Sequence, residues 1–255
     1  EGPDASSSGP FVFRPIPKRL IFRDMITFTL LDLFAFIWFL LAWVGIGFVV
    51  DLTRIGGPSL SRLMDEERRQ WMRHMAAREV RIVDTAIMAS LQNGTAFFAS
   101  ASMIALGGAF TLLNQTDRMM EIFHDLPFHL ASSKSELEIK IVMLVVIYGY
   151  AFFKFGWAYR LFNYAAILIG AVPPANDPDV AARERAIVRA ADMQIDAGHH
   201  FHWGLRALFF SLGLFGWFID ARVFLATTTF ILAVLLRRQY LSKARKALLI
   251  RHDLD

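Results

Sequence analysis

Four long apolar runs constrain this chain more than any other feature of its sequence. The first, Thr27–Val50, has 24 residues and would extend about 36 Å as an α-helix, longer than the roughly 30 Å hydrocarbon core of a bilayer. The others are Thr85–Leu113, Ile139–Val172 and Trp203–Leu236. Hydrophobic residues make up 55% of the chain, above the level of about 45–50% in soluble domains. The runs therefore predict an all-α fold, a polytopic membrane helical bundle.

The last apolar run is long enough for two short crossings. It contains 34 residues and is interrupted near its middle by Asp220-Ala221-Arg222. One straight helix of this length would overshoot the bilayer by about 20 Å, whereas a tight hairpin gives two spans of about 17 residues, near the lower limit for a crossing. We therefore predict about five membrane segments, with the last two forming the hairpin.

The distribution of Lys and Arg favours five spans over four. With the N-terminus outside, five spans place 16 of these residues on the inside and 8 on the outside, whereas four spans give at best 13 and 10. Basic residues accumulate in the cytoplasmic loops of membrane proteins. We therefore expect an external N-terminus and a cytoplasmic C-terminus.

Two charged stretches between the runs carry apolar residues at helical spacing. In Ser59–Val83 these residues are Leu60, Met64, Trp71 and Met75. In the stretch that starts near Asp177-Pro178-Asp179 they are Val180, Ile187, Ala191 and Ile195. Such spacing predicts two amphipathic interfacial helices on the cytoplasmic side. Gly198 is expected to end the second of them.

Composition divides the chain into three parts. Residues 1–23 begin with a Ser- and Gly-rich stretch without periodicity and are expected to form a flexible polar N-terminal tail. Residues 24–242 are expected to form a single helical membrane domain, and residues 243–255 a basic cytoplasmic tail. The net charge of +4 suits contact with anionic lipids of the bilayer, and no compact basic face favours nucleic acid. The absence of cysteine excludes disulfides, thiol catalysis and cysteine-type metal sites.

Several ionisable residues lie within the apolar runs and are candidates for a transport site. They are Asp32, Lys154, Arg160, Asp220 and Arg222. A charge at membrane depth is costly unless it is paired. Asp32 is interpreted either as an ion or proton site or as a carboxylate near the headgroups. Lys154 is either a transport residue or the ion-pair partner of Asp32 or Asp220, while Arg160 can extend to the interface.

Three histidines, His199, His200 and His202, stand just before the last apolar run. His199 and His202 are three positions apart, so on a helix they could share a metal ion, and histidine at a membrane boundary could also bind haem. The alternative is an interfacial turn organised by His200 and Arg206. No His-Glu-x-x-His motif, phosphate-binding loop or nucleophile elbow is present in the sequence. We therefore predict no cofactor and no catalytic residue.

The run Thr85–Leu113 contains small residues at every fourth position. They are Ala86, Ser90 and Gly94, followed by Ala101, Ala105 and Ala109. Such stripes let membrane helices approach closely. We therefore expect this run to be the central packing helix and the protein to form a homo-oligomer or to bind partner membrane subunits.

Four separated strings of sequence resemble one protein family. They are Ser90–Ser102 (SLQNGTAFFASAS), Phe153–Val172 followed by Pro173, Ala197–Arg206 (AGHHFHWGLR) with Gly216-Trp217-Phe218, and Arg237–Ser242 (RRQYLS). In this order they resemble the bacterial and plant membrane family known as domain of unknown function 599, over roughly Leu30 to Ser242. His202 stands where the family pattern has Asn. The resemblance implies a multi-span fold, which we expect in a bacterial inner membrane, and implies no established activity, substrate or cofactor.

Three functional interpretations follow from these features. The first is a non-catalytic subunit, accessory or structural, of an oligomeric membrane assembly. The second is an ion or small-solute channel or transporter that uses the buried charges. The third is a haem or metal redox protein that uses the histidine cluster. The small size of the chain, its packing stripes and the lack of catalytic motifs favour the first.

Overall fold

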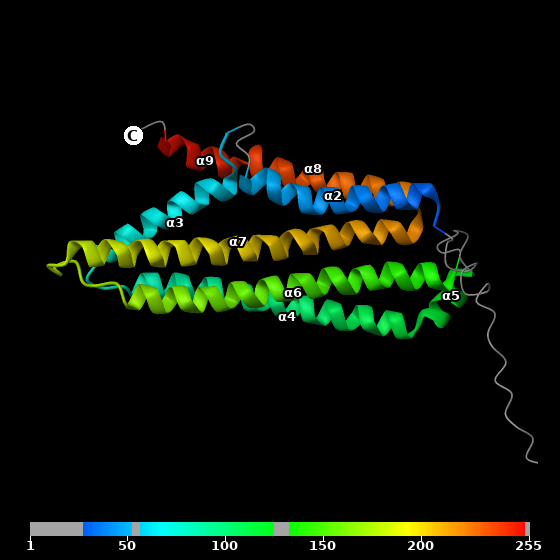
Figure 1. Cartoon of the computed structure of the whole chain (residues 1–255), viewed down its shortest axis with the longest axis horizontal. Coiled ribbons are helices and arrows are strands. Elements are labelled where there is room, and N and C mark those ends of the chain that lie inside the picture. The colour runs from blue at the N-terminus through cyan, green and yellow to red at the C-terminus, as the bar shows by residue number, and fades with distance from the viewer. Residues whose placement is uncertain (1–27, 53–56, 125–132, 253–255) are drawn as a thin grey trace, which may run out of the picture.

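The computed structural model describes residues 28–52, 57–124 and 133–252, and within these ranges the ordered elements are all helices (Figure 1). They are α2 (Leu30–Leu52), α3 (Leu60–Ala76), α4 (Ile82–Asn114), α5 (Thr116–His124), α6 (Lys134–Gly170), α7 (Val180–Ile219), α8 (Ala221–Tyr240) and α9 (Lys243–His252). Three of them, α2, α4 and α6, are long and apolar enough to cross a membrane. The all-α class is confirmed, and the apolar helices indicate a membrane protein. The predicted tail at residues 1–23 lies outside the described ranges.

Side-chain caps determine where four of the helices begin. In each case a Ser or Asp oxygen accepts a hydrogen bond from a backbone N–H two or three residues further on, which satisfies one of the free donors of the first turn. The capping residues are Ser59 for α3, Ser133 for α6, Asp179 for α7 and Asp220 for α8. At the other end of α6, Arg81 donates to the carbonyl oxygens of Ile169 and Val172.

The bundle has two halves along its long axis. Helices α4, α6 and α7 run its full length, whereas α2 and α8 flank one half and α3 flanks the other (Figure 1). The core divides in the same way. In the α2–α8 half it is built around Phe39, Phe155, Phe210 and Phe224. In the α3 half it is built around Met72, Met75, Phe162 and Ile187.

Two of the long helices exceed the thickness of a bilayer. The 23 residues of α2 and the 20 residues of α8 extend about 35 and 30 Å, close to the thickness of a hydrocarbon core. The 37 residues of α6 and the 40 residues of α7 extend about 55 and 60 Å. A bilayer matched to α2 and α8 therefore leaves about 20–30 Å of α6 and α7 beyond it, as continuous helix rather than as a break.

Of the two predicted amphipathic helices, the first is present as α3, whereas the second is not a separate helix. Helix α3 is amphipathic, but its apolar face packs along α7, and it buries Leu63 and Met72 while Met64 is 37% exposed. The second predicted helix is the first part of α7, which continues without interruption through Gly198. Both amphipathic stretches therefore pack their apolar residues against other helices of the bundle.

Gly198, which was expected to end a helix, and Gly204 both lie inside α7, where they allow close contacts. A Cβ at Gly198 would lie 2.7 Å from Nη2 of Arg68, on α3. A Cβ at Gly204 would lie 2.8 Å from the ring of Phe155, on α6. The interfacial turn predicted around His200 and Arg206 is therefore absent, and glycine is required here by the neighbouring helices rather than by a helix end.

The predicted hairpin in the last apolar run is present as a helical hairpin. Helix α7 ends at Ile219, Asp220 forms both its C-cap and the N-cap of α8, and the two helices pack together. A Cβ at Gly216 would lie 2.5 Å from Oγ1 of Thr227, so the two helices approach closely. Residues 243–252, expected as a tail, form α9, where Nε of Arg245 donates to the carbonyl oxygen of Pro58 at 3.0 Å.

Candidate functional site

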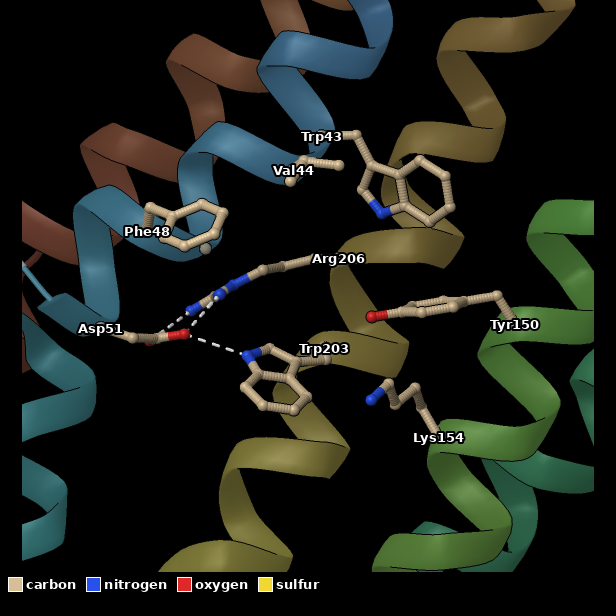
Figure 2. Close-up of a pocket in the computed structure, with 9 residues that line it drawn as sticks. Trp43, Val44, Phe48, Asp51, Tyr150, Lys154, Trp203 and Arg206 are labelled. Carbon is tan, nitrogen blue, oxygen red and sulfur yellow. Dashed lines mark hydrogen bonds and ion pairs between the residues drawn. The ribbon is translucent and has the colours of Figure 1, made fainter.

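The most developed concave site is a groove formed by α2, α6 and α7 near the junction of the two halves (Figure 2). Its cavity volume is about 470 Å³, within the range of small-molecule sites. The lining residues are Trp43, Val44, Gly47, Phe48 and Asp51 from α2, Tyr150 and Lys154 from α6, and Trp203 and Arg206 from α7. Aromatic and aliphatic side chains form most of the wall, and three charged groups are gathered at one side.

Asp51 and Arg206 form a two-pronged ion pair in this groove. Nη1 of Arg206 lies 3.1 Å from Oδ2 of Asp51, and Nη2 lies 3.1 Å from Oδ1. Nε1 of Trp203 also donates to Oδ2, at 3.0 Å (Figure 2). The side chain of Arg206 is 5% exposed and that of Asp51 is 21% exposed. Burial strengthens the pair electrostatically, so each charge is compensated by the other.

Lys154 points into the groove and forms no ion pair within the described ranges. Its Nζ lies 4.4 Å from the ring centroid of Trp203 and 5.3 Å from that of Tyr150, so two aromatic faces attract the ammonium group (Figure 2). The predicted pairing with Asp32 or Asp220 is wrong. With Asp51 and Arg206 paired, the residues that line the groove carry one net positive charge, and the carboxylate of Asp196, on α7, lies near enough to Lys154 to attract it.

The other ionisable residues in the apolar runs lie elsewhere. Asp32 is in the first turn of α2, where it accepts hydrogen bonds from Nε1 of Trp217, at 3.0 Å, and from Thr29. Asp220 accepts from the backbone N–H of Arg222 at the hairpin turn. These residues are at the opposite end of the α2–α8 half from Lys154 (Figure 1). The candidate transport residues therefore do not form one site.

Arg160 is separate from the groove as well. It lies further along α6, and its side chain is exposed. Its Nε donates to the hydroxyl of Tyr164 at 2.7 Å, and its guanidinium lies 5.7 Å from the ring of the same residue. A hydrogen bond between helices is formed nearby by Asn163, whose Oδ1 accepts from Nε2 of Gln92, on α4, at 2.8 Å.

The histidine cluster has different neighbours at each position. Nε2 of His199 lies 2.9 Å from Oδ2 of Asp65, on α3, and Arg68 donates to the other oxygen of that carboxylate. This hydrogen bond raises the pKa of His199 against the lowering effect of burial. His200 packs edge-on against the ring of Trp203, with centroids 4.9 Å apart. Within the described residues, no three His, Asp or Glu side chains gather around a common point as metal ligands would.

The two stripes of small residues on α4 differ in their exposure. Ala101 and Ala105 are half-buried and Ala109 is buried in the core of the α2–α8 half. Ala86, Ser90 and Gly94 are exposed, and a Cβ at Gly94 would meet no atom within 4 Å. The buried face of α4 instead repeats every seven residues. Its members are Met88, Thr95, Ser102 and Ala109.

The central ion pair was missed at the level of sequence. Asp51 ends the first apolar run, and Arg206 lies inside the last. A buried arginine requires a partner of opposite charge, so the position of Arg206 inside an apolar run indicates that a carboxylate lies beside it. The partner could not be chosen by sequence, because the pair joins residues 155 positions apart.

In the described residues the fold is all-helical, and three helices long and apolar enough to cross a membrane indicate a helical membrane protein. The chain matches, over residues 34–244, the family described as "Protein of unknown function, DUF599". It therefore belongs to this family, and the resemblance seen in the sequence is confirmed. No match was found among curated proteins or among solved structures.

Proposed function

We propose that the chain is a five-span protein of a bacterial inner membrane and acts as a non-catalytic subunit of a membrane assembly. The five spans are α2, α8 and the parts of α4, α6 and α7 in the α2–α8 half. The N-terminus lies outside and the α3 half lies in the cytoplasm.

The arrangement of connections supports this topology. The start of α2, the end of α4, the start of α6 and the α7–α8 turn lie at one end of the bundle (Figure 1). The ends of α2 and α8 lie near the junction of the halves, and the α6–α7 turn lies at the far end of the α3 half (Figure 1). Alternate connections therefore fall on opposite sides of a bilayer matched to α2. The side of the α3 half then receives the larger share of Lys and Arg.

The observation that carries the proposal is an apolar surface on α4 and α6 in the α3 half. We call it the α4–α6 face, and its most exposed members are Ile82, Val83 and Ile167. Ile82 is 72% exposed and Ile167 is 67% exposed. The opposite side of the same half carries charged residues, among them Arg69, Arg73, Glu184 and Arg189. Lipid would not cover the α4–α6 face in the proposed topology, so a protein surface is needed.

The occupant we propose is a second copy of this chain. Ala86, Ser90 and Gly94 form a shallow stripe in the α4–α6 face, and small side chains let two helices approach closely. Two copies related by a twofold axis would place this stripe of one α4 against the same stripe of the other. A different membrane subunit is the alternative occupant that the test below distinguishes.

Cysteine cross-linking tests the proposal directly because the chain contains no cysteine. Gly94→Cys in membranes should form a disulfide-linked dimer on mild oxidation. Val188→Cys, exposed on α7 in the same half, is the matched control and should remain monomeric. The native mass of the gently solubilised protein should be that of an oligomer. A monomeric mass together with no cross-link at Gly94 would overturn the proposal, and a stable complex with other subunits would replace the second copy by a partner.

The transport interpretation has less support. Asp32 and Lys154 lie at opposite ends of the α2–α8 half, and their neighbours differ: Asp32 has Thr29 and Trp217, whereas Lys154 has two aromatic rings. Charges that relay an ion are expected to line one pathway. We therefore do not propose a transport pathway through these residues.

A further inference from the structure

We propose that the groove between α2, α6 and α7 binds one anionic phospholipid of the cytoplasmic leaflet, with the phosphate at Lys154 and an acyl chain along α2. The inference rests on the five-span topology of the proposed function but does not depend on oligomerisation.

The net positive charge of the residues that line the groove favours the binding of an anion. Lys154 is held over the faces of Trp203 and Tyr150, and its three N–H donors are not consumed by a carboxylate of the described chain. Asp51 does not repel an anion strongly, because both of its oxygens accept from Arg206 and one also accepts from Trp203. One negative charge at Lys154 would bring the groove to neutrality.

The shape and lining of the groove select an amphiphile rather than a free ion. The part next to the ion pair is polar, whereas the wall formed by Trp43, Val44 and Phe48 is apolar. Val44 is 53% exposed and Phe48 is 59% exposed, so this wall continues onto the outer surface of α2 (Figure 2). A volume of about 470 Å³ far exceeds that of a phosphate group and can hold a headgroup with the start of a chain.

The depth of the groove selects the cytoplasmic leaflet. Asp51 is the last residue of the apolar segment of α2, and Lys154 lies close to the point where α6 leaves the α2–α8 half. Trp43, Tyr150 and Trp203 also line the groove, and aromatic residues of this kind are common at a membrane interface. Anionic lipids of the cytoplasmic leaflet would present their phosphates at this depth.

The test is lipid binding to the full-length protein in detergent, measured by native mass spectrometry. Phosphatidylglycerol and phosphatidylcholine with identical chains serve as probes, together with inorganic phosphate. The wild-type protein should bind phosphatidylglycerol about tenfold more tightly, because its headgroup carries a net negative charge whereas the choline cation of phosphatidylcholine offsets the phosphate. Lys154→Gln should remove this preference. Arg160→Gln, an exposed charge change on the same helix, should retain it.

A second variant separates the groove from general surface charge. Gly47→Leu adds an uncharged side chain at a position where the nearest atom to a new Cβ is Nη1 of Arg206, at 3.5 Å, so the side chain enters the groove while Lys154 stays in place. It should weaken phosphatidylglycerol binding as strongly as Lys154→Gln does. Equal binding of the two lipids by the wild type, or full binding by either variant, would overturn the proposal.

Inorganic phosphate distinguishes a soluble anion from a lipid. If phosphate alone displaces phosphatidylglycerol at millimolar concentration, the site is for a soluble phosphate compound and the lipid assignment fails. A protein that is monomeric but still selects phosphatidylglycerol through Lys154 would refute the assembly proposal and support this one.

Discussion

Arg206 shows how a charged residue can be accommodated in an apolar helix. The guanidinium is almost fully buried, yet Asp51 accepts from two of its N–H groups and Trp203 donates to the same carboxylate. A paired buried charge contributes little by itself, but removal of one partner leaves the other charge without compensation. The pair therefore constrains how α2 is placed against α7.

The first prediction concerns this ion pair. Asp51→Ala should lower the free energy of unfolding by about 3–5 kcal/mol, because it leaves Arg206 buried without a carboxylate. The double variant Asp51→Ala with Arg206→Met should lose much less, since neither charge remains. Unfolding in a denaturing detergent series measures both. An equal loss in the single and double variants would show that packing, not charge compensation, is the role of these residues.

The second prediction concerns His199. Its hydrogen bond to the carboxylate of Asp65 raises its pKa, with a smaller favourable effect of Asp51 and an opposing one of Arg68. The protonated form is thus favoured in the folded state, so this contribution is fully present below about pH 6.5, the value of an unperturbed histidine, and is lost as the pH rises through the raised pKa.

The melting temperature at two pH values measures this contribution. His199→Gln should lower the melting temperature more at about pH 6 than at about pH 9. His74→Gln, an exposed histidine on α3, is the control and should have no such dependence. A loss that is independent of pH would mean that His199 acts through packing alone.

At the scale of the helices, glycines inside α7 mark where neighbouring helices touch. A Cβ at Gly216 would lie 2.5 Å from Oγ1 of Thr227 and 3.1 Å from the carbonyl oxygen of Val223, on α8. Gly216→Ala should therefore destabilise the fold by about 1–3 kcal/mol, because the hairpin must open slightly. Gly149→Ala, where a Cβ meets open space, should be neutral or slightly stabilising. An unaffected melting temperature for Gly216→Ala would contradict the close hairpin contact.

Most elements could be predicted from the sequence, and the failures share one cause. Apolar length indicated α2, α4, α6 and the hairpin, and the polar interruption marked the turn at Asp220. Gly198 was interpreted as a helix end because glycine commonly ends helices. In the structure, the guanidinium of Arg68 occupies the space that a side chain at this position would need. Local sequence cannot report a contact with a residue 130 positions away. The same limit hid the Asp51–Arg206 pair and the aromatic neighbours of Lys154.

At the scale of the whole molecule, the two halves of the bundle meet different solvents in our account. In the topology that we propose, the α2–α8 half would lie in lipid, where its exposed apolar residues need no protein cover. The α3 half would lie in water, where α3 and α7 present charge and the α4–α6 face is apolar. The paired charges, His199 and Lys154 lie near the boundary, where a charged group is least costly to hold beside lipid.

The measurement that tests this account most directly is the accessibility of single cysteines to a membrane-impermeant thiol reagent in intact cells. Arg222→Cys, exposed at the α7–α8 turn, should be labelled from outside. Arg69→Cys on α3 and Lys243→Cys at the start of α9, also exposed, should react only after the membrane is permeabilised. Labelling of Lys243→Cys in intact cells, or protection of Arg222→Cys, would contradict the five-span topology.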